Sequence, residues 1–490
     1  MATNLQPKKI ENLGIYGLVR PAEVTDALIP EGAVTESVNF HFDRKGASTT
    51  RPGMTALGST VLASRPATGL HNAQAGTAIV VFSNGSSSTI YSLSSGVWGV
   101  SLDGGTASVR VRFVDFGSYT IAINFMQNTY SSMRFWNAGS SRHWHNTGNP
   151  INPQHMWGRT PQFGDVYKNK VYLGGDTSVE GNRSRLYFSS VITTAGVITW
   201  SPTIDFVDMN PGDGEDMSSI RRYSTELLVF KPNYTYRFRT SSTDPDPLIK
   251  IGTRSHESVI EGTRGLYWHH DTGFYRYTGG YPLPVYRPIS DIVAAIPFGQ
   301  YDDIVGWSDP DHIYWSVGNL TVTEAGLSET FKNVVLRLTE SSDIWTMYSM
   351  AFDIRRAMTY TTGTTQSRIA ALDNGVVATL DSGTTDLGEP IEYRLRTKWE
   401  DWGSVGLQKV LDEIVATMEK SQAAELLYQV DEDPSWHTIG QFKGMVNYFN
   451  SLAIKFHRIR FRVSGTTRFE SSVFLGLEVT KGINEGLTLT

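Results

Sequence analysis

The sequence predicts an all-β protein, and three observations carry this prediction. Short runs that alternate apolar and polar residues, the pattern of half-buried strands, recur along the 490 residues. Turn-forming Gly, Asn, Asp and Ser separate these runs, and Gly alone occurs 46 times. Helical periodicity is almost absent. Together they predict a large β-propeller of about six irregular blades, with an extended N-terminal arm and a C-terminal β-sandwich.

Residues 1–37 are predicted to form the extended arm, because turn residues interrupt them and strand signals are few. An arm of this kind usually becomes ordered on a neighbouring subunit. The interrupting residues are Pro7, Gly14, Gly17, Pro21 and Pro30.

Residues 38–385 are assigned to the propeller, because strands recur there at intervals of about 8–12 residues over a long stretch. Turns are predicted at Asn84-Gly85, Lys168-Asn169 and Asn374-Gly375. Asn-Gly tolerates the positive φ angles that tight hairpins need. No exact repeat is visible, so the blades are expected to be degenerate.

Residues 391–490 are predicted to form a separate small β-sandwich after the linker DSGTTDLGEP. The stretch Val405–Tyr428 has two interpretations. It could form an amphipathic helix, or it could form two strands at Ile414–Met418 and Glu425–Val430. Strands are preferred, because the flanking sequence alternates on both sides.

Composition limits the function classes. The chain has 43 basic and 49 acidic residues, a net charge of −6, so no bulk positive field attracts nucleic acid. The absence of cysteine excludes disulfides, thiolate zinc sites and a cysteine nucleophile. The sequence starts without a signal peptide, and no run approaches the ~20 apolar residues of a membrane span. A soluble, unsecreted product is expected.

Motifs for catalysis are weak. Phosphate-binding loops and nucleophile elbows are missing, and His269-His270-Asp271 has no nucleophile context. Four carboxylates leave a glycosidase pair open, but the turns typical of sialidase propellers are absent. The sequence therefore predicts no enzyme and no catalytic residue. The carboxylates are Asp302, Asp303, Asp309 and Asp311.

Two stretches raise the question of a metal. His143 and His145 have the spacing that places two imidazoles on one face of a strand, yet no third ligand accompanies them. The acidic loop from Asp208 to Asp216 could wrap Ca²⁺ or could be a solvated turn, and it lacks the EF-hand spacing. No metal and no cofactor are predicted.

Four strands carry arginine in alternation with apolar residues, so each presents a row of guanidinium groups on one face. Such rows could contact acidic neighbours or a phosphate backbone, or they could be solvated faces paired with acids across the sheet. These possible interface or DNA-facing residues are Arg110, Arg112, Arg237, Arg239, Arg394, Arg396, Arg458, Arg460 and Arg462.

Three passages resemble a known family. Val38–Leu57 contains an Asn-led strand and an Arg-Pro-Gly stop. Glu226–Gly280 contains a Phe-Lys turn, an Ile-Gly-x-x-Ser-x-x-Ser-Val step and an aromatic hairpin ending in Gly. In this order, and with the terminal stretch that contains TKWEDWGS and RIRFRV, they resemble tailed-phage virion β-propeller proteins of the tail-nozzle, packaged-DNA stabilisation or head-to-tail connector type.

The resemblance implies a structural virion protein, assembled in the host cytoplasm, that forms a ring of identical copies, expected to be a hexamer. Its partners would be the portal, the adaptor and other tail proteins, and viral DNA would pass without sequence-specific contact. The alternative is a peripheral tail protein that recognises a host glycan or receptor. Its stacking platforms would be Trp144, Trp157, Trp268 and Trp307.

Overall fold

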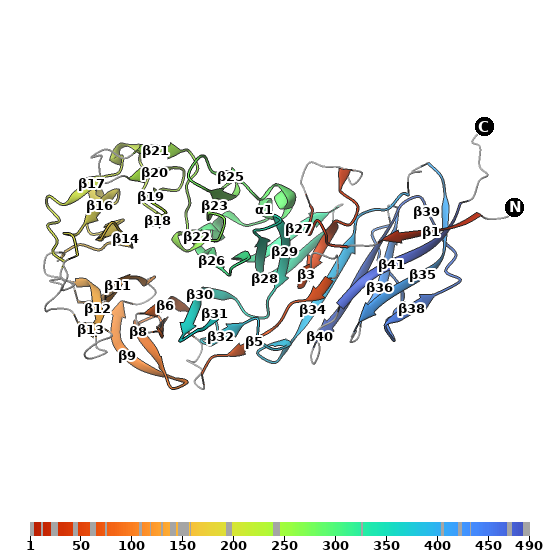
Figure 1. The fold of residues 1–490 in the computed structure, drawn as a ribbon, viewed down its shortest axis with the longest axis horizontal. Coiled ribbons are helices and arrows are strands. Elements are labelled where there is room, and N and C mark those ends of the chain that lie inside the picture. The colour runs from red at the N-terminus through yellow and green to blue at the C-terminus, as the bar shows by residue number, and fades with distance from the viewer. Residues whose placement is uncertain are drawn as a thin grey trace.

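A computed structural model shows a chain built almost entirely from β-strands, arranged as a ring beside a sandwich (Figure 1). The structure describes residues 4–483, except 11–12, 21–27, 43–47, 59–64, 74–75, 107–109, 118, 129–130, 138–143, 146–155, 157, 193–197, 239–245, 325–326, 403–405, 420–423, 432 and 468–472. Within these residues, no helix is both long and apolar enough to span a bilayer.

The ring begins with five separate four-stranded antiparallel sheets, each formed by strands consecutive in sequence. They are β6 (Ala67–Ala73), β7 (Thr77–Ser83), β8 (Ser87–Ser94) and β9 (Val97–Thr106); β10 (Arg112–Phe116), β11 (Tyr119–Asn128), β12 (Ser131–Asn137) and β13 (Trp144–His145); β14 (Phe163–Tyr167), β15 (Lys170–Gly174), β16 (Arg185–Phe188) and β17 (Phe206–Asp208); β18 (Ser219–Tyr223), β19 (Glu226–Phe230), β20 (Thr235–Phe238) and β21 (Asp246–Ile249); β22 (Ile260–Glu261), β23 (Leu266–His270), β24 (Gly273–Tyr277) and β25 (Leu283–Pro284).

Two further four-stranded arrays complete the ring and belong to a larger sheet of 14 strands. The sixth array contains β26 (Val305–Ser308), β27 (His312–Glu324), β28 (Leu327–Thr339) and β29 (Ile344–Ser349). The seventh contains β30 (Ile354–Thr362), β31 (Thr365–Leu372), β32 (Val377–Leu380) and, from far earlier in the chain, β5 (Met54–Ala56). The expected count of six is not confirmed, because the described residues contain seven such arrays.

Alternation within strands explains how the ring closes. On β7, Val80 and Phe82 pack with Ile369 of the seventh array, whereas Ile79 and Val81 pack toward the second array. A two-residue period places successive side chains on opposite faces, so one strand contributes to two neighbouring cores. Equivalent apolar clusters lie between the other adjacent arrays.

Short helical segments in the described residues connect successive arrays, except for one that lies within the third array. They are one α-helix, α1 (Ser290–Ala294), and the 3-10 turns η4 (Glu180–Asn182), η5 (Pro211–Asp213), η6 (His256–Ser258), η7 (Arg287–Ile289) and η8 (Phe298–Asp303). The three predicted tight turns lie between paired strands, and Lys168 and Asn169 have φ angles of 45° and 56°. The predicted hairpins are confirmed.

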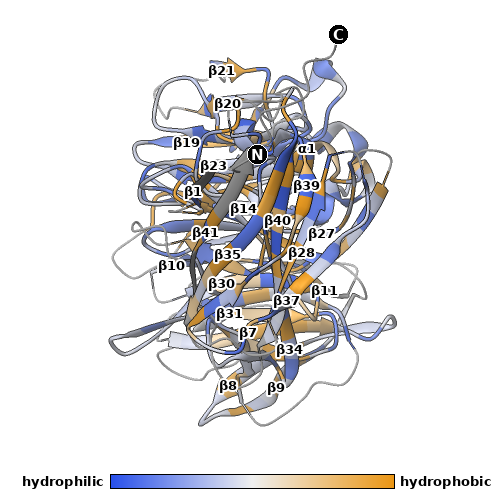
Figure 2. Ribbon diagram, turned by 90° about the vertical axis from the view of Figure 1, so that its right-hand side faces the viewer, coloured by the Kyte–Doolittle hydropathy of each residue, from blue (hydrophilic) through white to orange (hydrophobic). Residues whose placement is uncertain are grey.

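The sandwich consists of two sheets whose inner faces enclose an apolar core that includes Leu395, Ile414 and Phe461. Figure 2 faces the sandwich and shows hydrophobic and hydrophilic residues alternating along its strands. One sheet contains β2 (Val34–Val38), β34 (Glu389–Thr397), β40 (Ile459–Thr467), β36 (Glu425–Val430) and β37 (His437–Gln441). The other contains β1 (Asn4–Ile10), β3 (Phe40–Phe42), β4 (Ser48–Thr50), β35 (Lys409–Glu419), β38 (Val446–Phe449), β39 (Ile454–Phe456) and β41 (Val473–Ile483). The preference for strands over a helix within 405–428 is confirmed by β35 and β36.

The N-terminal residues do not extend away from the chain as predicted. β1 pairs antiparallel with β41 along its whole length, and β2 pairs with β34. Leu13 and Leu18 are buried at 2% and 1% exposure. The prediction relied on prolines and turn residues as signs that no strand forms. Proline is tolerated on an edge strand, and within the described residues β1 pairs only with β41, so Pro7 is compatible with β1.

Ring and sandwich are joined through the backbone. β29 of the sixth array bridges to β2, which in turn pairs with β34 of the sandwich. In the seventh array, β33 (Thr385–Asp386) pairs with both β5 and β34. Figure 1 shows β29, β34 and β5 where the two lobes meet. The chain therefore enters the sandwich without a loose linker.

Candidate functional site

A cluster of charged side chains, here called the junction cluster, lies between the sandwich and the tip of the β27–β28 hairpin. It brings together Glu36, Glu324 and Glu329 with Arg20, Arg394, Arg396, Arg460 and Arg462. Glu324 lies 2.7 Å from Arg396 and 2.5 Å from Arg460. Glu36 is almost fully buried and lies 2.8 Å from Arg462. Four of the predicted arginines thus bind acids of their own chain.

In the junction cluster, burial and the neighbouring arginines shift the carboxyl pKa values in opposite directions. Burial alone would raise the pKa of Glu324, but the facing guanidinium groups of Arg396 and Arg460 hold it at about 2. The pKa of Glu36 is also lowered against the effect of burial, by Arg396 and Arg462. Both carboxylates are therefore charged at neutral pH. Glu324 holds the hairpin against the sandwich, and Glu36 on β2 binds arginines of β34 and β40 within the sandwich.

Acid should loosen this junction. A folded-state pKa below the ordinary value of 4.5 means that the stabilisation is complete above pH 4.5 and is lost as pH falls toward about 2. We expect the midpoint of thermal unfolding to fall between pH 5 and pH 3 by less in Glu324→Gln than in the wild type. Exposed Glu180 provides the control, Glu180→Gln. Identical pH profiles for the wild type and Glu324→Gln would contradict the prediction.

The remaining predicted arginines are placed separately. Arg237 on β20 lies 3.5 Å from Glu226 of the neighbouring strand. Arg458 stacks over Trp399, with 5.3 Å between the guanidinium carbon and the ring centroid. Arg239 lies outside the described residues. Arg110 and Arg112 lie at the centre of the ring.

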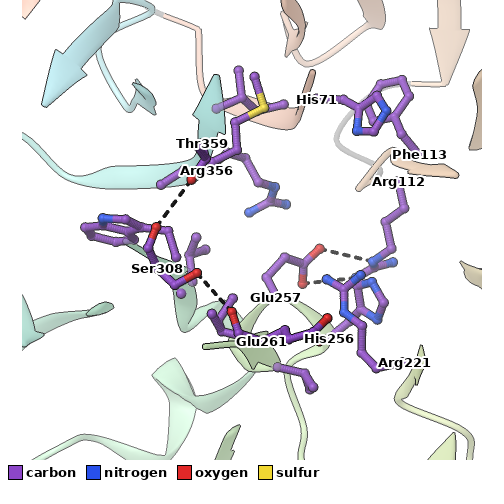
Figure 3. Close-up of a pocket in the computed structure, with 18 of the residues that line it drawn as sticks. His71, Arg112, Phe113, Arg221, His256, Glu257, Glu261, Ser308, Arg356 and Thr359 are labelled. Carbon is purple, nitrogen blue, oxygen red and sulfur yellow. Dashed lines mark hydrogen bonds and ion pairs between the residues drawn. The ribbon is translucent and has the colours of Figure 1, made fainter. Parts of the chain in front are cut away.

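A cavity of about 450 Å³ lies at the centre of the ring and is lined by the first strands of the arrays (Figure 3). In the fifth array the first strand, β22, has only two residues, and η6 takes its place along the wall. This turn is the middle of the Ile-Gly-x-x-Ser-x-x-Ser-Val step. Ser258 Oγ donates to the Ser255 carbonyl at 2.8 Å, and Ser255 Oγ donates to the Ile304 carbonyl at 2.7 Å. The two serines fix the residues between them, His256 and Glu257, toward the cavity.

Glu257 is the central carboxylate of this cavity. Arg112 Nε lies 3.0 Å from it, and Arg110 lies at 3.8 Å. Burial alone would raise the pKa of Glu257, yet Arg112 and Arg356 hold it well below its usual range. Figure 3 shows Arg112 and Arg356 reaching toward Glu257 from different walls.

His256 lies beside Glu257 and is 6% exposed. Its Nδ1 and the Ser219 hydroxyl are 2.8 Å apart. Burial, together with the positive charges of Arg221 and Arg112, lowers the pKa of His256 well below its usual value. The imidazole is therefore neutral at physiological pH, and the surrounding potential is positive.

The sequence prediction missed most of this site. Arg221 and Arg356 stand in strands with no conspicuous arginine alternation, and His256-Glu257 has no metal or catalytic spacing. The available signal was the pair of serines around His256-Glu257, because a serine at each end of a short turn fixes its backbone.

A second cavity, of about 850 Å³, lies where the fifth, sixth and seventh arrays meet. Its charged wall contains Asp309, Arg368 and Asp381. Arg368 contacts both carboxylates, at 2.8 Å for Asp381. Tyr314 and His312 also contact Asp309, at 2.8 Å and 2.9 Å. These partners hold the pKa of Asp309 well below its usual range despite burial, whereas burial raises that of Asp381.

Asp309 is thus ionised and bound by several hydrogen-bond donors, an arrangement that suits a structural role. The other predicted carboxylates are dispersed: Asp303 pairs with Arg110, and the Asp302 carbonyl accepts from the same guanidinium. Asp303 lines one cavity and Asp309 another. The absence of enzyme activity stays a prediction.

His269 and the acidic loop from Asp208 to Asp216 have partners within the fold. Burial lowers the pKa of His269 to about 3, and its ring packs against Phe274 and Tyr301. In the loop, Asp213 binds the buried Lys231 at 2.6 Å. Asp208 and Asp216 pair with nearby arginines.

The metal and stacking hypotheses are tested only in part. Among the described residues, no group of three or more His, Asp or Glu side chains could hold a metal ion. His143 and Trp157 lie outside the described residues, as do the side chains of Trp144 and His145. Trp268 is fully buried, and Trp307 is 5% exposed and stacked on Tyr314. Neither is available as a surface platform.

The comparisons with known proteins identify no family for this chain. No protein-family profile matches the chain, and no curated protein matches it. Among solved structures, the extracellular domain of a protein described as a hybrid two component system from B. thetaiotaomicron matches 67% of this chain with a TM-score of 0.42 and 11% identity. A second structure, described as a one component system from the same organism, has a TM-score of 0.40 and 11% identity over 66% of this chain. In each case the match spans 39% of the other chain.

Proposed function

We propose that the ring is a seven-bladed β-propeller and that the protein is a structural virion component of a tailed bacteriophage, forming a ring of copies in the tail or head-to-tail connector. The observation that carries this proposal is that the residues behind the family resemblance hold the fold together. Resemblance at such positions favours a shared architecture over a chance match of surface residues.

The Arg-Pro-Gly stop illustrates this point. Arg51 binds Asp386 with both terminal nitrogens, at 2.9 and 2.6 Å, and donates from Nε to Asn39 at 2.8 Å. A Cβ on Gly53 would lie 2.0 Å from the Thr385 carbonyl oxygen. The motif therefore binds the N-terminal strands to the segment that links ring and sandwich.

The rigid junction also supports the proposal. A continuous backbone ladder and a buried charge cluster fix the two lobes in one orientation, which suits a part that must hold its position in a large particle. The central cavity has a volume of about 450 Å³, which is in the range of small-molecule sites. DNA would accordingly pass along the axis of the assembled copies and not through each propeller.

Electron microscopy of the native particle tests the proposal. We expect density for several copies around the tail axis, and a purified protein that assembles on portal complexes. A chain that stays a 54.4 kDa monomer in the presence of portal complexes, and that lies at the particle periphery, would overturn the proposal.

A further inference from the structure

The centre of the ring carries more guanidinium groups than its buried carboxylates balance. Arg112 is paired with Glu257, and Arg110 with Asp303. Arg221 and Arg356 also line the cavity, and neither forms an ion pair within the described part of the chain. Two guanidinium groups thus face the cavity without an ion-pair partner in the described residues.

The other carboxylates of the wall compensate them only in part. Asp165 accepts hydrogen bonds from the backbone N–H groups of Arg222 and Val166, both at 2.7 Å. Glu261 is exposed, as is the side chain of Arg222, so these two opposite charges offset each other at the rim. Asp115, nearby, is 3.0 Å from His71. The interior therefore keeps an excess of positive charge.

Arg356 projects from the seventh array into this cavity. Its guanidinium donates to the carbonyl oxygens of Thr68 and Arg355, at 3.3 and 2.5 Å. Figure 3 shows that it extends into the open centre of the cavity. Burial lowers the pKa of Arg356 to about 10, and Arg110 and Arg112 contribute to the shift. The pKa of Arg112 is likewise lowered, first by burial. A bound anion would relieve both effects.

We propose that the central cavity binds a phosphate-type oxyanion, held by Arg221 and Arg356 beside the Arg112–Glu257 pair. Guanidinium groups present paired N–H donors that match the oxygens of phosphate, and converging arginines are a common way to bind it. The volume of about 450 Å³ accommodates free phosphate or a small phosphomonoester. The site is independent of the assembly proposed above, because all its residues come from one ring.

Isothermal titration calorimetry at constant ionic strength tests this site, with inorganic phosphate in one arm and a nucleoside 5′-monophosphate in the other. We expect one molecule bound per chain. Loss of one charged hydrogen-bonding partner should weaken binding by about tenfold or more in Arg356→Gln and in Arg221→Gln. Tighter binding of the nucleotide would identify a phosphomonoester site, and equal or weaker binding a site for free phosphate.

The matched control is Arg183→Gln, whose guanidinium lies outside the cavity and 45% exposed. It should bind like the wild type. Circular dichroism verifies that each variant is folded, and partly exposed Arg221 provides a test if Arg356→Gln is unstable. Absence of binding to the wild type at millimolar phosphate, or equal weakening in Arg183→Gln, would overturn the proposal.

Discussion

Arg51→Met is expected to lower the free energy of unfolding by about 3–5 kcal/mol, because it leaves the buried carboxylate of Asp386 without its counter-charge. The two side chains are only 3% and 2% exposed, and Asp386 accepts one other hydrogen bond, from the Ala351 N–H at 3.2 Å. Urea denaturation monitored by tryptophan fluorescence measures the change.

Arg183→Met is the control for Arg51→Met. It breaks a 2.9 Å ion pair with Asp216 whose side chains are 45% and 58% exposed, so a loss of about 0–1 kcal/mol is expected. The double variant Arg51→Met/Asp386→Leu removes both buried charges and should recover part of the loss. If Arg51→Met costs no more than the control, the assigned role of this pair is wrong.

Gly252→Ala is expected to lower the free energy of unfolding by about 3 kcal/mol or more. An added side-chain atom that meets other side chains usually costs about 1–3 kcal/mol, and the cost is higher here because the opposing atoms belong to the backbone. The added Cβ would lie 1.8 Å from the Lys231 carbonyl oxygen and 2.7 Å from the Tyr234 backbone nitrogen. These atoms belong to the turn that buries Lys231, and the Thr253 N–H donates to the same Lys231 carbonyl at 3.0 Å. The midpoint of chemical unfolding reports the loss.

Gly299→Ala is the matched control for Gly252→Ala. An added Cβ there meets nothing within 4 Å. We expect a neutral result or a small gain, about 0.4–1 kcal/mol at most, from the reduced freedom of the unfolded chain. Equal effects of the two substitutions would show that the close approach at Gly252 is relieved at little cost.

The all-β class and the local hairpins could be predicted, because alternation and turn residues act over a few neighbouring positions. The seventh array could not, since its fourth strand, β5, comes from more than 300 residues earlier in the chain. The same limit applies to the N-terminal segment. Nothing near Pro7 reveals that Thr480 is its partner.

The arginine rows show a similar limit for the candidate site. Alternation correctly placed Arg394 and Arg396 on a strand, but their acidic partners, Glu36 and Glu324, lie on separate elements. The sequence left open whether such rows face acids of the chain or other molecules. Within the described residues seven of the nine arginines pair with acids of the chain and Arg458 stacks over Trp399, whereas contact with other molecules stays a prediction. The central cavity depends on side chains from seven arrays, which no local pattern brings together.

The pairing of β1 with β41 has a consequence for biosynthesis. β1, β2, β4 and β5 find partners in strands made more than 300 residues later, β41 for β1 and β4, β34 for β2 and β32 for β5. Until then their backbone groups and the apolar residues beside them have no native partner, and pairing across such sequence separations is slow. The five internal sheets can form as soon as their own strands are made, whereas ring closure must wait for β32 and the sandwich for β41. Nascent chains should therefore depend on chaperones mainly through their N-terminal segment.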